Sequence, residues 1–292
     1  MNDRSRDLLL RLGVINVYKR GEQRAPHKPL YLLLLLARLQ QGMPRLVRFV
    51  EIREKLNKAL RLFAPRVASV NAHYPFWRLQ NDRLSEVVYQ GDLKIRQSND
   101  DPTVSSLIAS DARGGLKQED FELLVGNLDL QSLVAHKILD AHFPHVIHGD
   151  IVNFFGLRLN TPHRDDYSSY SEFAASVINA YKGRCAISGF SIFYQGTPSG
   201  LDATHICWPQ TGGNDAVSNG IAMTAMHARL FHLGIFTISP AYKIMLSNDG
   251  DFSESGQALG LIKGHRIDVP SDPSDQPNVD ALAWHNKSVF RG

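Results

Sequence analysis

LDATHIC at residues 201–207 opens the stretch that decides the fold expected for the C-terminal half, and it is followed by GGND (212–215), NGIAM (219–223) and MHARLFHLG (226–234). Apolar residues bounded by turn residues predict a strand that ends in His205 and a loop that contains Asn219. The last segment predicts a helix that carries His227 and His232. We therefore expect a histidine on a strand to face histidines on a helix.

This arrangement suits the hydrolysis of a phosphodiester. The reaction needs a base that activates water and a cation that neutralises charge on the phosphate and the leaving oxygen. His205 would be the base, and Asn219 would either orient its ring or bridge the loop. Positions 228 and 232 are four apart, so they share one helix face and would grip one ion together. Position 228 is Ala228, position 232 is His232, and His227 is rotated from that face by about 100°.

Each of these histidines alone favours a simpler interpretation. A single histidine in a strand is more often a structural residue than a base, and His232 alone is as typical of a helix surface as of a ligand. The order of the segments is what favours a catalytic interpretation of His205. Cys207 is expected to be a small buried residue, and Gly212 with Gly213 forms a turn without the lysine of a phosphate-binding loop.

Together with CAISGF (185–190) and WHNKSVF (284–290), these segments resemble the HNH endonuclease family over residues 172–291. The family pattern is a CAxxG turn, then E/D-A-x-H-I, N-G-L-x-L and L-H-H-x-L-F-D-x-G. The resemblance implies a ββα-metal fold and a divalent ion, Mg²⁺, Mn²⁺ or another. It also implies a general base at His205, an asparagine at Asn219, and a helical ligand at the position of Ala228 or at His227.

Three positions depart from the family pattern. Ala228 stands where the second histidine of the family's pair stands, His232 replaces an aspartate, and Ser188 replaces a frequent second cysteine. Without a CxxC pair we expect no structural zinc. A single ligand-to-alanine change indicates either natural loss of a ligand or a deliberate inactivating substitution, and we favour the second. The alternative to an endonuclease is therefore a protein that binds DNA without cleaving it.

Charge is unevenly distributed along the chain. Residues 1–96 hold 19 Lys/Arg against 8 Asp/Glu, a net of +11, and the remainder holds 13 against 21, a net of −8. Lys and Arg gain affinity for a polyanion by releasing phosphate counterions. The first third is therefore expected either to bind nucleic acid or to present a solvated basic face.

Hydrophobic periodicity predicts an α+β protein with a mainly helical N-terminal domain at residues 1–150, a linker at 151–171 and a ββα nuclease domain at 172–292. The expected N-terminal helices cover 7–17, 29–41, 49–63 and 120–142. Residues 74–79 and 84–88 are expected to be strands or extended segments around a turn. Another helix, 172–181, would open the second domain.

Two N-terminal segments combine prolines and aromatic residues with basic groups: RAPHKPLY (24–31) and HYPFWRLQND (73–82). Such residues suit a rigid apolar pocket rimmed by phosphate-binding groups. The simpler alternative is that the aromatic residues belong to the core. Nearby basic residues favour a nucleic-acid surface; they are Arg20, Arg24, Lys28, Arg78 and Arg83.

These segments resemble the sulfur-binding domain of restriction enzymes that recognise phosphorothioated DNA, over about residues 5–150. The resemblance implies that Tyr74, Pro75 and residue 78 form a cavity for the sulfur, and that His27 and Lys28 contact the backbone or base edges beside it. The family favours a small residue at position 78, where this chain has an arginine. The full set of expected DNA contacts is Arg20, Arg24, His27, Lys28, Tyr74, Pro75, Phe76 and Arg78.

The combined expectation is a modification-dependent endonuclease of bacterial defence that binds phosphorothioated double-stranded DNA and cuts nearby. Because one nuclease unit cuts one strand, a double-strand break would require either dimerisation or two visits, and a homodimer is expected at least transiently. A second alternative is an HNH nuclease that recognises modified bases. The two cysteines and the absence of a signal-peptide pattern predict a cytoplasmic protein, and the longest apolar run, 30–36, is too short to span a membrane.

Overall fold

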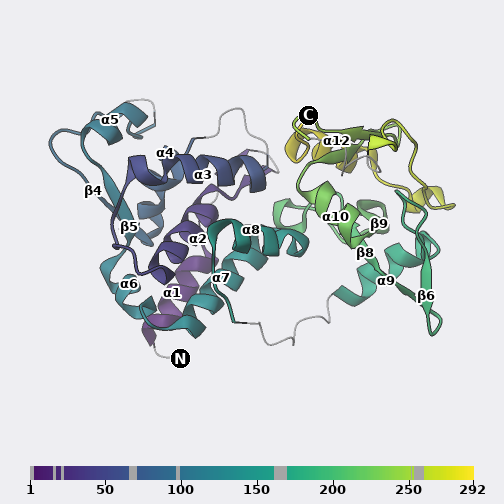
Figure 1. The fold of residues 1–292 in the computed structure, drawn as a ribbon, viewed down its shortest axis with the longest axis horizontal. Helices are drawn as coiled ribbons and strands as arrows, with labels where there is room; N and C mark the ends of the chain where they lie inside the picture. Colours follow the sequence, from purple (N-terminus) through teal and green to yellow (C-terminus); the bar gives the residue numbers. More distant parts are fainter. Residues whose placement is uncertain are drawn as a thin grey trace. The chain divides into compact units, whose positions relative to one another are not determined.

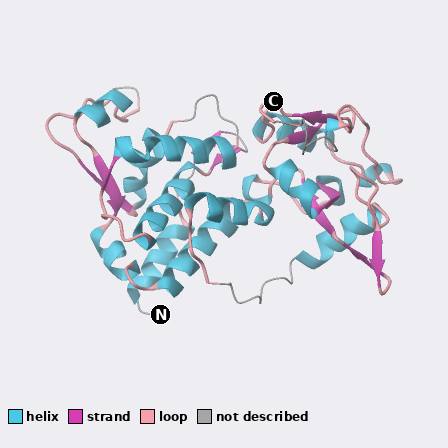
Figure 2. Ribbon diagram, viewed as in Figure 1, coloured by secondary structure: helices cyan, strands magenta, loops and turns pink. Residues whose placement is uncertain are grey.

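The computed structural model describes residues 3–15, 18–20, 23–65, 71–96, 99–160, 170–250, 252 and 260–292. It forms two compact units, Met1–Pro162 and His163–Gly292, each built from helices and small antiparallel sheets (Figures 1 and 2). The fold class is therefore α+β, as predicted. Within the described ranges, no helix combines the length and apolarity that crossing a membrane requires.

The N-terminal unit is organised around α2 (His27–Gln40), whose apolar residues from Pro29 to Ala37 are all buried. A helix that is apolar on every side needs cover on every side. That cover comes from α3 (Phe49–Phe63), α4 (His73–Arg78), α7 (Leu128–His142) and α8 (His148–Phe155). The other helices of the unit are α1 (Asp3–Gly13), α5 (Val104–Ala109) and α6 (Gln118–Leu124).

A three-stranded antiparallel sheet packs on this helical core. Its order is β3 (Val47–Arg48), β5 (Arg113–Leu116), β4 (Ser85–Val88), and β1 (Tyr18–Arg20) pairs with β2 (Gln23–Ala25) in a separate hairpin. A Cβ atom at Gly114 of β5 would lie 2.7 Å from the Phe76 ring and 2.8 Å from the Tyr31 hydroxyl. Glycine is therefore required where the central strand meets the core.

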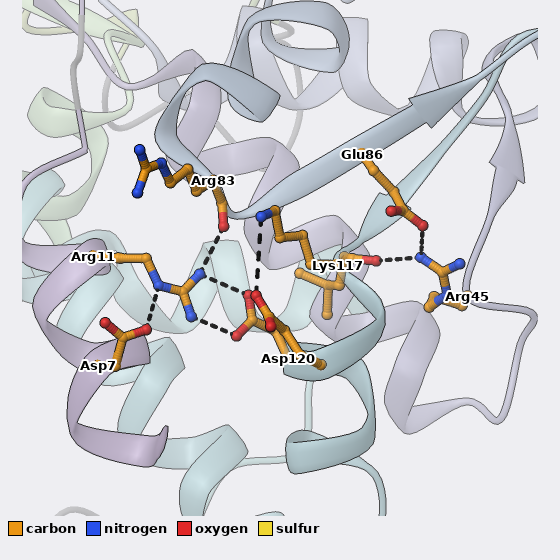
Figure 3. Close-up of polar contacts among 9 residues, drawn as sticks. Asp7, Arg11, Arg45, Arg83, Glu86, Lys117 and Asp120 are labelled. Carbon is orange, nitrogen blue, oxygen red and sulfur yellow. Dashed lines mark hydrogen bonds and ion pairs between the residues drawn. The ribbon is translucent and has the colours of Figure 1, made fainter. Parts of the chain in front are cut away.

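An ion-pair network joins α1 to α6 and to the turn before β4 (Figure 3). The Arg11 guanidinium donates to both carboxylate oxygens of Asp120, at 2.8 and 2.6 Å, to Asp7 at 2.8 Å and to the Arg83 carbonyl at 2.7 Å. Beside it, Arg45 pairs with Glu86. Because the Asp120 side chain is only 3% exposed, Arg11 supplies the positive charge that this buried carboxylate needs.

The C-terminal unit contains the predicted strand and helix. Strand β8 (Leu201–His205) pairs antiparallel with β9 (Gly220–Thr224), so that His205 lies opposite Gly220, and β9 leads directly into α10 (Ala225–His232). Helix α9 (Tyr170–Ala180) packs on this hairpin. The unit is completed by β6 (Ile192–Tyr194), β7 (Thr197–Ser199), β10 (Phe236–Ile238), β11 (Ile244–Leu246) and α12 (Val279–Ser288).

Several helix predictions are confirmed. Helix α3 has the predicted bounds, α2 and α9 begin two residues before the predicted start, and 84–88 contains β4. The segment 120–142 is not one helix, because Gly126 adopts a left-handed conformation at φ 71° and Asn127 begins α7 by accepting a hydrogen bond from the Leu130 amide.

Two other predictions are wrong. Residues 74–79, expected to be extended, lie in α4 and a following 3₁₀ turn, where Pro75 occupies the first helical turn and so removes no needed amide. The predicted linker begins too early, because residues 151–155 belong to α8 and bury Ile151 and Phe155 against the first unit. The boundary between the two units falls at Pro162.

Replacing Arg11 with leucine is expected to lower the free energy of unfolding by about 2–3 kcal/mol, because the Asp120 carboxylate would stay buried without its cation. Urea denaturation followed by circular dichroism measures the change. The matched control is Arg6→Leu, which removes an exposed pair with Asp3 and is expected to cost less than about 0.5 kcal/mol. Equal effects of the two substitutions would contradict the role given to Arg11.

Candidate functional site

Helix α4 carries three of the predicted pocket residues. Pro75 is buried, and Tyr74 is half-buried beneath the Arg78 guanidinium, which lies 4.9 Å from the ring centre. Arg78 also donates two hydrogen bonds to the Asp101 carboxylate, at 2.8 and 2.5 Å. Residue 78 therefore presents an arginine whose charge is already matched by a buried aspartate.

His73, the first residue of the HYPFWRLQND motif, is a buried histidine that was not among the expected DNA contacts. Its ring stacks on Tyr74 with 4.0 Å between the centroids, and neither ring nitrogen has a hydrogen-bond partner among the described residues. Burial, assisted by the positive charges of Arg96, Arg78 and Arg53, lowers the pKa of His73 to about 4, against the opposing effect of Asp101. His73 is therefore neutral at physiological pH.

The start of α2 brings the second predicted segment to α4. Lys28 forms a 2.5 Å ion pair with Asp82, which lies in the turn after α4, and both side chains are largely buried. Burial lowers the pKa of His27 to about 4, so its ring is neutral and its Nε2 atom has no partner among the described residues. The two motifs selected from the sequence thus lie side by side, and the charges of Lys28 and Arg78 are both matched by carboxylates.

One predicted DNA contact needs correction. Phe76 is fully buried and packs on Tyr31 and Phe49, with centroid distances of 5.8 and 5.0 Å, so it belongs to the core rather than to the surface. Arg20 and Arg24 fall on β1 and β2, and their side chains lie outside the described residues.

In the C-terminal unit, His205 is held from two sides. Its ring stacks on Phe173 of α9, with 3.9 Å between centroids and 12° between planes, and its Nε2 atom lies 2.9 Å from Asp215 Oδ1. Burial lowers the pKa of His205, and the Asp215 carboxylate opposes that shift. Asp215 belongs to the GGND motif but was not predicted as a site residue, because its position ten residues after His205 gives no signal of the contact.

Asn219 fixes the loop that carries Asp215. Its Oδ1 atom accepts from the Cys207 amide at 2.9 Å, and its Nδ2 atom donates to the carbonyls of Cys207 at 3.0 Å and Asn214 at 2.8 Å. A Cβ atom at Gly213 would lie 2.0 Å from the Cys207 carbonyl, so the loop closes tightly. Asn219 was expected either to orient the His205 ring or to bridge the loop, and these contacts correspond to the bridge.

His232 lies at the end of α10 and is buried. Its Nδ1 atom has no partner among the described residues, and burial, followed by the charge of His205, lowers its pKa to about 3. The ring meets the edge of Trp208 at a centroid distance of 5.9 Å. One turn earlier, Ala228 is buried and offers no donor atom.

His227 is engaged elsewhere. Its Nδ1 atom lies 2.8 Å from Thr224 Oγ1 and 3.6 Å from Cys185 Sγ. Burial raises the pKa of the Cys185 thiol, but hydrogen bonds with His227 and Ser188 outweigh this effect and lower it to about 6. The Nδ1 atom of His227 is therefore engaged by Thr224 and by the cysteine of the CAISGF turn.

The divalent ion implied by the HNH resemblance does not fit the residues present. Across the part of the chain that the structure describes, no three His, Cys, Asp or Glu side chains converge in a way that could hold a metal. The unpartnered nitrogen of His232 suits one ligand, but Ala228 supplies no second one from the helix. Zinc sites use three or four protein ligands, and Mg²⁺ is usually held by one or two carboxylates together with substrate phosphates; the surroundings of His232 offer neither set among the described residues, so no chemical step is assigned to a metal here.

Comparison with known families decides the identity of the N-terminal unit. The family model described as "ScoMcrA-like, DNA sulfur-binding domain" matches residues 5–160. The chain belongs to this family. The match ends two residues before the boundary of the unit at Pro162 and does not extend into the C-terminal unit. No curated protein is similar enough to count as a match.

Solved structures of similar proteins include other sulfur-binding domains. The sulfur-binding domain of ScoMcrA complexed with phosphorothioated DNA is 25% identical, with 51% of this chain and 94% of that chain covered and a TM-score of 0.47. That of SprMcrA complexed with phosphorothioated DNA is 19% identical, with 53% and 95% covered and a TM-score of 0.45. The Type IV phosphorothioation-dependent restriction endonuclease ScoMcrA is 22% identical, with 53% and 32% covered and a TM-score of 0.44.

The buried histidines of the C-terminal unit of this sulfur-binding protein predict acid sensitivity. His232 has a pKa of about 3 and His285 a pKa well below 6.5, both chiefly because burial disfavours the charged ring. An unfolded chain binds these protons near pH 6.5, so stability is complete above that pH and falls below it, by about 1.4 kcal/mol per pH unit for each histidine. Urea denaturation of metal-free protein between pH 7.5 and 4.5 measures the slope.

Two variants test whether His232 contributes to this dependence of the unfolding free energy on pH. His232→Leu is expected to make it shallower by the contribution of one histidine, whereas His265→Gln, at an exposed position, is expected to leave it unchanged. A slope that is unaffected by His232→Leu would contradict the buried, neutral state of this residue.

Proposed function

We propose that this chain is a restriction-related protein whose DNA binding depends on a modification. Its N-terminal unit would recognise phosphorothioated double-stranded DNA. Membership in the DNA sulfur-binding family carries the proposal. The contacts of Tyr74, Pro75 and Arg78 on α4 support it, because they supply an aromatic ring, a proline and an aliphatic stem whose charged end is turned to Asp101.

The chemistry of sulfur explains why such a surface discriminates. Sulfur in place of a non-bridging phosphate oxygen is larger, more polarisable and less well hydrated. A pocket of proline and aromatic carbon gains from contact with sulfur, while an oxygen would lose its hydration there without a replacement hydrogen bond. Since Arg78 is paired with Asp101, its stem can line this pocket without presenting a free cation to every phosphate.

The first test is a binding titration of one duplex, phosphorothioated at a single linkage or unmodified, at near-physiological salt. The modified duplex is expected to bind at least tenfold more tightly, which is about 1.4 kcal/mol. Tyr74→Ser is expected to reduce this preference toward one, whereas Tyr194→Ser, at an exposed position of the C-terminal unit, is expected to preserve it. Equal binding of both duplexes by the unaltered chain would exclude the sulfur pocket.

For the C-terminal unit we propose an HNH-type endonuclease domain. The strand β8, the loop after it, the strand β9 and the helix α10 support this proposal, together with the position of His205. His205 is the residue for the general base, since Phe173 fixes its ring plane and Asp215 binds one ring nitrogen, leaving the other to take a proton from water. One such unit cuts one strand, so cleavage of both strands takes either two units or two visits, and of these we propose a homodimer on DNA.

The structure bears on two alternative functions: it favours a protein that binds DNA without cleaving it, and it disfavours a nuclease that recognises a modified base. Ala228 and the lack of a converging ligand group among the described residues favour a non-cleaving protein that only binds modified DNA. A nuclease that recognises a modified base would need an aromatic cage for the flipped base. Tyr74 of α4 is instead covered by His73 and Arg78, which disfavours that second alternative.

Ala228→His separates an impaired nuclease from a non-cleaving protein. The added imidazole lies one helical turn from His232, and in the presence of Mg²⁺ or Mn²⁺ we expect cleavage of phosphorothioated plasmid to rise at least tenfold, the effect of about 1.4 kcal/mol. The control is the same variant with His205→Ala, which is expected to remain inactive. Because position 228 is buried, circular dichroism and retained DNA binding verify folding; a folded, binding variant without cleavage would favour the non-cleaving protein.

A further inference from the structure

The basic residues of the N-terminal unit fall into two groups. Among the described residues, six are neutralised by carboxylates in ion pairs of 2.8 Å or less: Arg11, Lys28, Arg45, Arg48, Arg78 and Arg113. Two of them, Lys28 and Arg78, are among the DNA contacts expected from the sequence. Because affinity for DNA comes largely from cations that replace phosphate counterions, basic residues near α4 that have no such carboxylate partner are candidates for supplying it.

One face of α3 provides such cations. Arg53, Asn57 and Arg61 are spaced four residues apart and so follow one another along one face of the helix. Asn57 Oδ1 accepts a hydrogen bond from the Ala72 amide at 2.9 Å. Ala72 directly precedes α4, so this face of α3 lies beside the helix that carries the pocket residues.

The cations on this face are exposed and available. Arg53 and Arg61 are exposed, as is Lys58, which lies beside this row, three residues before Arg61. Among the described residues no ion pair joins a carboxylate to any of the three, although the exposed Glu54 lies one helical turn before Lys58. Burial is the main cause of the lowered pKa of His73 next to Tyr74, and after Arg96 and Arg78 the charge of Arg53 also contributes, which places Arg53 near that ring. A row of unpaired cations beside an apolar pocket is complementary in charge and place to a phosphate backbone that enters that pocket at one modified linkage.

We propose that the exposed face of α3 formed by Arg53, Lys58 and Arg61 binds the DNA phosphate backbone next to the sulfur pocket and supplies the modification-independent part of the affinity. This inference rests on the proposed recognition of DNA by the N-terminal unit. It assigns the preference for sulfur and the overall affinity for DNA to different helices. Helix α4 selects the modified linkage, and α3 binds the flanking phosphates whether or not sulfur is present.

The test uses the full chain with Arg53→Gln, Lys58→Gln and Arg61→Gln combined, since glutamine preserves helix propensity. Binding of the phosphorothioated and the unmodified duplex is measured from 50 to 300 mM salt. The charge-matched control combines Arg4→Gln, Arg6→Gln and Lys137→Gln on the exposed surfaces of α1 and α7, which lie on the far side of α2 from α3 in Figure 1. Circular dichroism verifies that both variants fold.

We expect the α3 variant to weaken binding of both duplexes by the same factor, at least about fivefold at 0.15 M salt, which is the effect of removing a single phosphate-binding cation. The plot of log K against log salt should become shallower by about 0.9 for each phosphate that the protein no longer neutralises. The ratio between modified and unmodified duplex should stay unchanged, and the control should match the unaltered chain.

The outcomes separate this inference from the function on which it rests. Unchanged affinity and salt slope in the α3 variant, or an equal loss in the control, would overturn the role of α3 even if sulfur is still preferred. Loss of the preference with an unchanged salt slope would place Arg53, Lys58 and Arg61 in the selecting pocket instead, and would also overturn it. If the unaltered chain does not distinguish the two duplexes, the sulfur proposal fails, while a shallower slope would still support α3 as the phosphate-binding face.

Discussion

The burial of α2 is the constraint on which the N-terminal unit depends. Its run of leucines has no polar face, so helices must cover it from several directions, and α3 and α4 are two of them. That packing brings the start of α2 to the turn after α4, where Lys28 meets Asp82. It also places the Arg53–Arg61 face of α3 beside α4, through Asn57 and the Ala72 amide. The position of the candidate DNA surface therefore follows from the need to bury an apolar helix.

Internal ion pairs then shape what this surface can distinguish. A free cation attracts every phosphate, modified or not, whereas a cation held by a buried carboxylate contributes shape with little net charge. Asp101 and Asp82 hold Arg78 and Lys28 in this way, next to the proline and aromatic carbon of α4. Discrimination of sulfur from oxygen requires such a surface, because the difference between them is one of hydration and polarisability more than of charge. Charge on a neighbouring helix adds affinity without reducing that difference.

Secondary structure that depends on local residue patterns was predicted from the sequence. Features that depend on contacts between residues far apart in the chain were not. The period of apolar residues located α2, α3 and α9, and the order of motifs located the strand ending in His205 and the helix of His232. The helix at 73–78 was missed because its aromatic residues favour strands in isolation, while packing of Phe76 on Tyr31 and Phe49 decides the outcome. Pairing of Arg78 with Asp101 and of His205 with Asp215 could not be predicted from spacing, because loops bring those carboxylates back.

The C-terminal unit shows how protein groups alone can position His205, the residue proposed as general base. Asn219 ties together the backbone around Cys207 and Asn214, which fixes the loop that presents Asp215 to His205, and none of these contacts depends on an ion. The histidine is therefore positioned by protein groups alone. By contrast, His232 keeps a buried nitrogen without a described partner, an arrangement that costs free energy unless a ligand or a water molecule offsets it. The contacts of Asn219 and Asp215 therefore account for the placement of His205, while on α10 the side chain of Ala228, one turn before His232, offers no donor atom to that nitrogen.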